Sequence, residues 1–256
     1  MNFTFKNIFA LIFELLIVIT CISARFDLLM NHIKWTNLLK FLTEWNFTFT
    51  LVYFFFASIK SIVNLFSTSG NKKKEEKAKS QRKEKKQPKK EEKKIQEQKT
   101  TLLINFFTFA MTICLLMTIV FWVLFNLDRE LIFPQAQIDK LPKYFNHVLH
   151  TLPMVAITIE YLINPKHLQQ PISIKCVLSI TFVFLVSYIA IIAYVYHTTK
   201  AWIYPFIGLL PLTYLIAFFL VTILFAVLLS FFIIFLIRSR QKFSKREKIE
   251  KQKKQN

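Results

Sequence analysis

The sequence is short of the residues that turn and cross-link many compact folds. It contains 2 Gly and 3 Cys among 256 residues, and 15 acidic residues against 34 basic ones. Two glycines cannot supply the turns that a transmembrane β-barrel needs between its alternating strands. The cysteines are odd in number, lie in apolar runs and form no CxxC pair. They therefore argue against a disulfide framework and against a cysteine metal knuckle. The phosphate-binding, dinucleotide-binding and nucleophile-elbow motifs are also absent from the sequence.

What is abundant is apolar sequence, and the charge is confined to two stretches. Hydrophobic residues make up 54% of the chain, 29 residues are Phe and the mean hydropathy is +0.40. Residues 72–99 have a net charge of +8 and residues 238–256 have +7, which together make 15 of the 19 net positive charges. This separation rules out a water-soluble globular fold. A basic folded face would favour nucleic acid as a partner, but low-complexity stretches do not, so no nucleic acid is expected.

Six apolar stretches are long enough to cross a bilayer, which takes about 20 helical residues. The sequence therefore predicts an all-α integral membrane protein with six transmembrane helices and the lipid bilayer as its environment. The first stretch is expected to be a retained helix, because its apolar run is too long for a signal peptide and contains Glu14. The predicted spans are Phe3–Ala24, Leu38–Phe66, Thr101–Leu127, Phe145–Ile163, Ile172–Thr199 and Leu212–Ile237.

Four regions follow from this division: residues 1–70 with helices 1 and 2, a linker at 71–100, residues 101–237 with helices 3–6, and a basic tail at 238–256. The linker is rich in Lys, Glu and Gln without an apolar stripe, so it is predicted to be a disordered, solvated loop. An alternative is that it binds anionic lipid headgroups. Basic segments remain on the cytoplasmic side, and an even number of spans separates linker from tail. Both termini are therefore expected in the cytoplasm, in a protein of the endomembrane system or plasma membrane.

Polar residues gather near the outer ends of four predicted helices. Such groups are expensive in a membrane, usually face the bundle interior and often mark a functional site. They are Thr43, Glu44, Asp128, Arg129, Glu130, Asn146, His147, His150 and His197.

The spacing His147-x-x-His150 places two rings on one helical face, and three interpretations remain open. Both rings together with His197 could hold Zn²⁺. One ring could be a general base that activates a hydroxyl group. The third interpretation is that they are interfacial histidines bonded to neighbouring helices.

Several short motifs, taken together in order and spacing, resemble the androgen-induced-gene family of multi-pass membrane proteins. The resemblance extends from Thr43 to Phe206, and the predicted helix count agrees over nearly the whole chain. The matching residues are Lys40-Phe41-Leu42-Thr43, Phe121-Trp122, Asp128-Arg129-Glu130 with Pro134, Asn146-His147-x-x-His150-Thr151 with Glu160, and His197 with Trp202-x-Tyr204-Pro205-Phe206.

The resemblance implies a hydrolase of fatty-acid esters of hydroxy fatty acids, with a membrane lipid as substrate. Members of that family use a threonine at the start of helix 2 and a histidine on helix 4, which match Thr43 and His150 here. No metal or organic cofactor is implied. The expected supporting or substrate-binding residues are Asn46, Asn146, His147, His197, Trp202 and Tyr204. Two other classes stay open: a non-catalytic lipid-binding membrane protein and a histidine-metal membrane enzyme.

Overall fold

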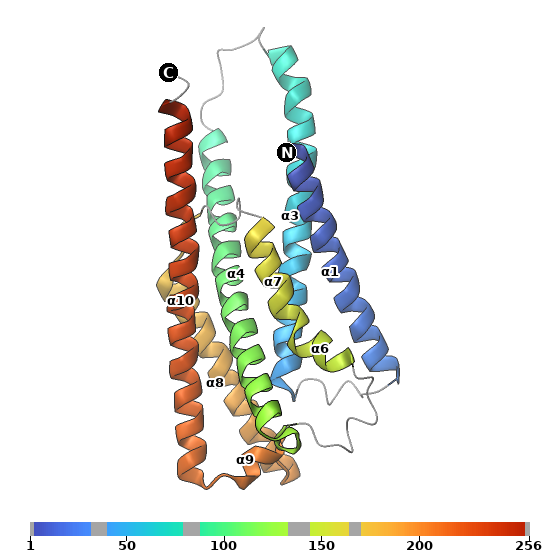
Figure 1. Ribbon diagram of the computed structural model, residues 1–256. Helices are drawn as coiled ribbons and strands as arrows, with labels where there is room; N and C mark the ends of the chain where they lie inside the picture. The colour runs from blue at the N-terminus through green and yellow to red at the C-terminus, as the bar shows by residue number, and fades with distance from the viewer. Residues whose placement is uncertain (1–2, 32–39, 79–87, 133–143, 164–169, 254–256) are drawn as a thin grey trace.

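The computed structural model describes residues 3–31, 40–78, 88–132, 144–163 and 170–253. The described part is a bundle of helices that run up and down in turn, and it contains no strand (Figure 1). The all-α prediction is therefore confirmed for these residues. The helices are α1 (Phe3–Asn31), α3 (Leu42–Ala78), α4 (Pro88–Leu127), η1 (Arg129–Leu131), α6 (Tyr144–His150), α7 (Leu152–Ile163), α8 (Ile174–Thr199), α9 (Pro205–Leu209) and α10 (Leu212–Lys253).

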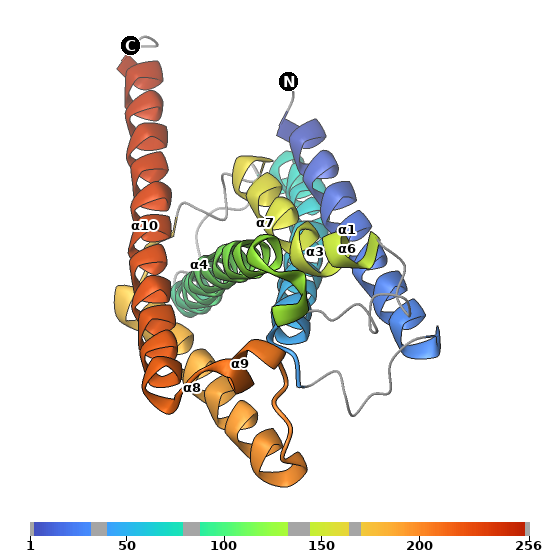
Figure 2. The ribbon, with the colours of Figure 1, turned by 60° about the horizontal axis from the view of Figure 1, so that its bottom comes forward.

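Helix α4 forms the centre of the bundle. It contacts α3, α7, α8 and α10, and the view from a tilted angle shows it between α10 on one side and α1, α3 and α7 on the other (Figure 2). In an 18-residue apolar stretch of α4, 61% of the residues are buried, against 28–33% in the corresponding stretches of the other four long spans. Because lipid is as apolar as Leu, such packing against neighbours, rather than water exclusion, holds membrane helices together.

Five described helices, α1, α3, α4, α8 and α10, are long and apolar enough to cross a membrane. The predicted fourth span corresponds to two shorter helices, α6 and α7, which meet at a bend around Thr151 (Figure 1). Pro153 explains the bend, because it has no N–H to donate to the carbonyl of Leu149 and its ring crowds that turn. The 12 residues of α7 extend about 18 Å, which is less than the roughly 30 Å of a bilayer core.

The charged stretches are more helical than the sequence predicts. The linker at 71–100 is expected to be a disordered loop, but α3 continues to Ala78 and α4 begins at Pro88, so only 79–87 lies outside the described residues. Likewise α10 continues through most of the basic tail, to Lys253. Lys, Glu and Gln are good helix formers, and extending an existing helix avoids the cost of nucleation. Proline is also favoured at the first position of a helix, which fits the start of α4.

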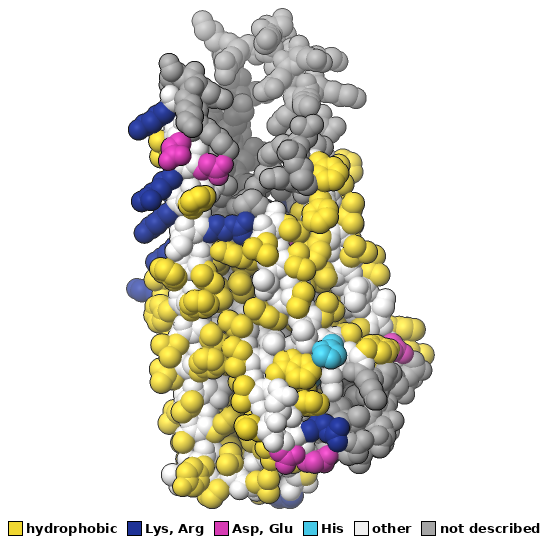
Figure 3. Space-filling view, viewed as in Figure 1, with side chains coloured by type: hydrophobic (Ala, Val, Ile, Leu, Met, Phe, Trp, Pro, Cys, Tyr) yellow, Lys and Arg dark blue, Asp and Glu magenta, His cyan; other side chains and the backbone are white. Residues whose placement is uncertain are grey.

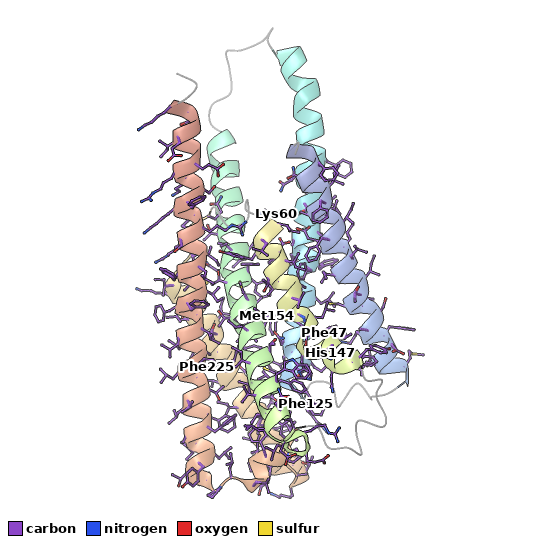
Figure 4. All side chains as sticks on the ribbon, viewed as in Figure 1. Phe47, Lys60, Phe125, His147, Met154 and Phe225 are labelled. Atoms are coloured by element: carbon purple, nitrogen blue, oxygen red, sulfur yellow. The ribbon has the colours of Figure 1, made fainter. Side chains whose placement is uncertain are left out.

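A buried polar network links α1, α3 and α7 inside the bundle. The Ser61 hydroxyl donates to Glu14 at 3.1 Å, and the Tyr53 hydroxyl donates to Glu160 at 3.4 Å. Lys60 interacts electrostatically with both carboxylates, and Figure 4 shows it toward the end of the bundle that holds the chain termini. Ionisable residues in membrane helices usually face the bundle interior in this way, away from lipid.

The outer surface agrees with a lipid environment. Apolar side chains cover the body of the bundle, and basic side chains gather along the terminal part of α10 (Figure 3). Large exposed apolar residues occur on every long span, for example Phe26, Phe66 and Phe235, each at least 64% exposed. Contiguous apolar surface of this extent marks contact with a membrane rather than with water.

Candidate active site

A cavity of about 690 Å³ lies at the end of the bundle opposite the chain termini. Its walls come from the start of α3, the second half of α4, His150 of α6, α8, α9 and α10. This volume lies within the range of small-molecule sites, which are mostly apolar with a few polar groups. Most of the lining here is apolar as well. The polar or amphipathic lining residues that matter below are Thr43, Glu44, His150, Tyr188, Trp202 and Tyr204.

Thr43 lies in the first turn of α3, at the wall of this cavity. The turn begins at Phe41, whose carbonyl accepts hydrogen bonds from the backbone N–H groups of Glu44 and Trp45 at 3.1 and 3.4 Å. The first backbone N–H groups of a helix have no partner within the helix, so they attract negative charge. Thr43 therefore lies at the positive end of the α3 dipole, which favours a developing oxyanion nearby.

His150 lies at the end of α6 and reaches the same cavity. Its ring is stacked on Phe121 of α4, with 3.3 Å between the ring centroids and 5° between the planes. Its Nδ1 is buried and has no hydrogen-bond partner among the described residues. Thr118, one turn before Phe121, donates to the backbone carbonyl of His150 at 2.8 Å. Helix α4 thus fixes both the ring and the backbone of this histidine.

The predicted pair, Thr43 and His150, is thereby brought to one cavity from two different helices. No hydrogen bond joins the two side chains within the described part of the chain. The Thr43 hydroxyl instead lies close to the Tyr204 hydroxyl. Catalytic contacts are often long in a free enzyme and shorten when substrate binds, so this geometry is compatible with a nucleophile and its base.

Two tyrosines hold the start of α3 against α8 and α9. The Tyr188 hydroxyl donates to the carbonyl of Lys40 at 3.0 Å and lies 3.2 Å from the Tyr204 hydroxyl. The Tyr204 hydroxyl accepts from the backbone N–H of Leu42 at 3.3 Å. Burial raises the pKa of Tyr204, so its phenol remains protonated and able to donate. Tyr188 was not among the residues predicted for the site, since nothing in its apolar sequence neighbourhood marks it.

Trp202 forms part of the cavity wall between α8 and α9. Its ring stacks on Tyr196, with 3.9 Å between centroids and 13° between the planes. Gly208 leaves room for it, because a Cβ at that position would lie 2.9 Å from Cδ1 of Trp202. Of the six residues expected to support the site, Trp202 and Tyr204 therefore line the cavity.

The other four supporting candidates lie outside the cavity lining. Asn46 is buried in the core, where its Oδ1 accepts from the thiol of Cys114 at 3.3 Å. Asn146 is half-buried on α6, and His197 is exposed near the end of α8. His147 is exposed on α6 (Figure 4). Its ring stacks on Trp122, with 5.2 Å between the ring centroids.

The three histidines of the metal interpretation are not gathered. His150 is stacked against α4 inside the cavity, whereas His147 and His197 are exposed on α6 and α8. Over the described ranges, no group of three His, Cys, Asp or Glu side chains is placed to hold a metal ion. The residues present do not form the three-ligand set that a catalytic zinc site requires.

The motif Asp128-Arg129-Glu130 has a local structural role. The Asp128 side chain accepts from the backbone N–H of Glu130 at 2.9 Å and so caps η1. Arg129 and Glu130 are both exposed, with 3.9 Å between guanidinium and carboxylate. Exposed pairs of this length contribute little to stability, so the motif chiefly ends α4 and turns the chain.

Comparison with known proteins gives one family. The family described as FAR-17a/AIG1-like protein matches residues 5–238. An androgen-dependent TFPI-regulating protein of Mesocricetus auratus is 33% identical over 117 residues, which is 45% of this chain and 49% of that protein. The androgen-induced gene 1 protein of Homo sapiens is 31% identical over 88 residues, which is 34% of this chain and 36% of that protein. The chain thus covers about half or less of these relatives' length. No solved structure matches it.

Proposed function

Because this chain belongs to the FAR-17a/AIG1-like family, we propose that it is a membrane-embedded lipid ester hydrolase. Its substrates are fatty-acid esters of hydroxy fatty acids or similar lipids. Thr43 is the nucleophile and His150 is the general base. The observation that supports this proposal most directly is that both residues, from separate helices, line one largely apolar cavity.

The reaction proceeds in two steps. His150 accepts the proton of the Thr43 hydroxyl, and Oγ1 attacks the ester carbonyl carbon to give a tetrahedral oxyanion. The intermediate collapses, the C–O bond of the ester breaks, and the leaving alkoxide takes the proton from His150. A water molecule then attacks the acyl-threonine while His150 accepts its proton. Return of that proton to Oγ1 releases the fatty acid and restores the enzyme.

The surroundings of the pair suit an ester with long acyl chains. The cavity wall consists mainly of apolar side chains from α4, α8 and α10, which can hold hydrocarbon. Its polar groups gather around the first turn of α3, where the scissile carbonyl would lie. The half-buried phenol of Tyr204 is the candidate donor to the oxyanion, and the positive end of the α3 dipole lies beside it.

The experiment that tests this function is covalent labelling of the purified protein in detergent with a fluorophosphonate lipid probe, followed by mass-spectrometric mapping. We expect labelling of Thr43 and its loss in Thr43→Ala and His150→Ala, together with loss of ester hydrolysis. A wild-type protein that takes up no probe and hydrolyses no lipid ester, although it is folded and binds lipid in the cavity, would instead indicate the non-catalytic lipid-binding class. Activity that survives Thr43→Ala and is abolished by a chelator would indicate the histidine-metal class.

A further inference from the structure

One face of α4 matches one face of α6 at the same helical spacing. One side of α4 carries Thr118 together with Phe121 and Trp122, which follow it by three and four residues. His147, His150 and Thr151 have the same spacing on α6 and at the bend that follows it. Phe121 stacks on His150, Trp122 stacks on His147, and Trp122 Nε1 donates to the Thr151 hydroxyl at 3.2 Å.

Phe121 covers the face of the His150 ring, whereas the orienting hydrogen bond of a catalytic histidine usually lies in the ring plane, at Nδ1. In the serine-protease arrangement a buried carboxylate accepts from Nδ1, fixes the ring and stabilises the imidazolium that forms. The Nδ1 of His150 is buried without such an acceptor in the described part of the chain. The flat contact with Phe121, 3.3 Å between centroids at 5°, is the close contact that restricts rotation of this ring.

We propose that Phe121 is a positioning residue for His150, orienting the imidazole by face-to-face stacking in place of a hydrogen-bonded carboxylate. The inference rests on the proposed function of His150 as base. The π face of Phe121 also attracts the imidazolium while His150 holds the proton, an effect that in other proteins is worth about tenfold in an equilibrium or rate. Phe121 is buried and belongs to the cavity wall, so it performs this role from inside the site.

A substitution series separates stacking from simple space filling. Phe121→Leu and Phe121→Met remove the π face, whereas Phe121→Tyr retains it. We expect kcat for ester hydrolysis to fall about tenfold or more in the first two variants, with KM little changed, and to stay near the wild-type value in Phe121→Tyr. If Phe121 only fills the wall, the Leu and Met variants instead change KM and keep kcat, and the inference is overturned.

A matched control comes from the same helix. Phe109 is buried on α4 and contacts Phe49, Phe106 and Phe184 but no histidine. Phe109→Leu therefore creates a similar defect away from His150, and we expect its kcat to remain near wild type. A fall in kcat in Phe109→Leu equal to that in Phe121→Leu would overturn the inference, because the loss would follow from core damage alone.

A second readout requires no substrate. Diethyl pyrocarbonate modifies accessible imidazoles, and mass spectrometry can follow His150 against His147, which is exposed in the same helix. We expect the His150 rate to rise severalfold in Phe121→Leu, relative to His147, and to stay low in Phe121→Tyr. An unchanged His150 rate overturns the stacking role whatever the activity. The proposed function is overturned instead if the wild type hydrolyses no ester, or if hydrolysis persists in Thr43→Ala. In either case the rate of His150 modification still decides whether Phe121 orients the ring.

Discussion

The guanidinium of Arg25 on α1 forms an ion pair with the carboxylate of Glu44 on α3, with 2.9 Å between Nη2 and Oε2. The same guanidinium donates to the hydroxyl of Thr48 at 2.8 Å and lies over the ring of Phe47. Glu44 directly follows Thr43 and lines the cavity. Arg25 therefore attaches the first turn of α3 to α1 and fixes the place of the proposed nucleophile.

Replacement of Arg25 by Ala is expected to destabilise the protein by about 2 kcal/mol, between the values for exposed and fully buried pairs. The two side chains are 19% and 5% exposed, so the carboxylate would be left nearly buried without its partner. Thermal unfolding in detergent measures the loss. The double variant Arg25→Ala/Glu44→Gln should be more stable than Arg25→Ala, because it leaves no unpaired charge. If its loss of stability instead equals the sum of the losses in the two single variants, the two side chains are not paired.

Substitutions at the proposed catalytic pair should separate chemistry from structure. Thr43→Ala and His150→Ala should each lower kcat/KM for ester hydrolysis by about 10³-fold or more, without loss of folded protein. Thr43→Ser should retain part of the rate, because the hydroxyl group remains. His147→Ala should cost less than His150→Ala, since His147 lies outside the cavity lining. Cys176→Ala, on α8 and outside that lining, serves as the control and should leave the rate unchanged.

Gly208→Ala should displace Trp202 from the cavity wall. The added Cβ would lie 2.9 Å from Cδ1 of the indole, so the ring or α9 must move. We expect a shift in tryptophan fluorescence and a higher KM, with folded protein retained. Leu209→Ala removes an exposed side chain from the next position of the same helix and should change neither quantity. Unaltered fluorescence in Gly208→Ala would show that the indole is not held by this contact.

Cysteine accessibility can determine the sides of the membrane. In a variant without the three native cysteines, single cysteines at Lys85 and Glu250 should react with an impermeant reagent only after the cytoplasmic side is exposed. Single cysteines at Asp139 and Lys200 should react from the opposite side. The basis is the concentration of basic residues in the linker and the tail, compared with 2, 3 and 1 Lys+Arg in the three segments expected outside. Labelling of all four positions from one side would contradict the six-span arrangement.

The sequence predicts the long helices well where apolar runs end at clear signals. The predicted third span ends at Leu127, as α4 does, and the predicted sixth span begins at Leu212, as α10 does. The fifth begins two residues early, because Ser173 is the N-cap of α8 and accepts from the backbone N–H of Cys176. The predicted first span is too short. Helix α1 continues past Arg25, because the charge of Arg25 is paired with Glu44 of α3. The fourth is divided by Pro153, a local effect that a hydropathy window does not detect.

The candidate site is only partly visible in the sequence. Thr43, His150, Trp202 and Tyr204 are predicted and reach one cavity, because each lies near the same end of its segment. Tyr188 and the stack of Phe121 on His150 depend on how each helix is rotated about its axis. A helix that is apolar on all sides has no amphipathic pattern to define this rotation. Contacts between such helices therefore follow from side-chain packing, which one sequence does not reveal.

The shortness of α7 has a consequence for the order in which the chain enters the membrane during synthesis. An isolated segment of 12 residues with a carboxylate near its end, Glu160, is a poor substrate for the translocon. Glu160 accepts a hydrogen bond from the hydroxyl of Tyr53. Helix α7 contacts α1, α3 and α4, all of which precede it in the chain. The earlier helices thus provide the surface against which α7 packs, and we expect α7 to insert only once they are in place.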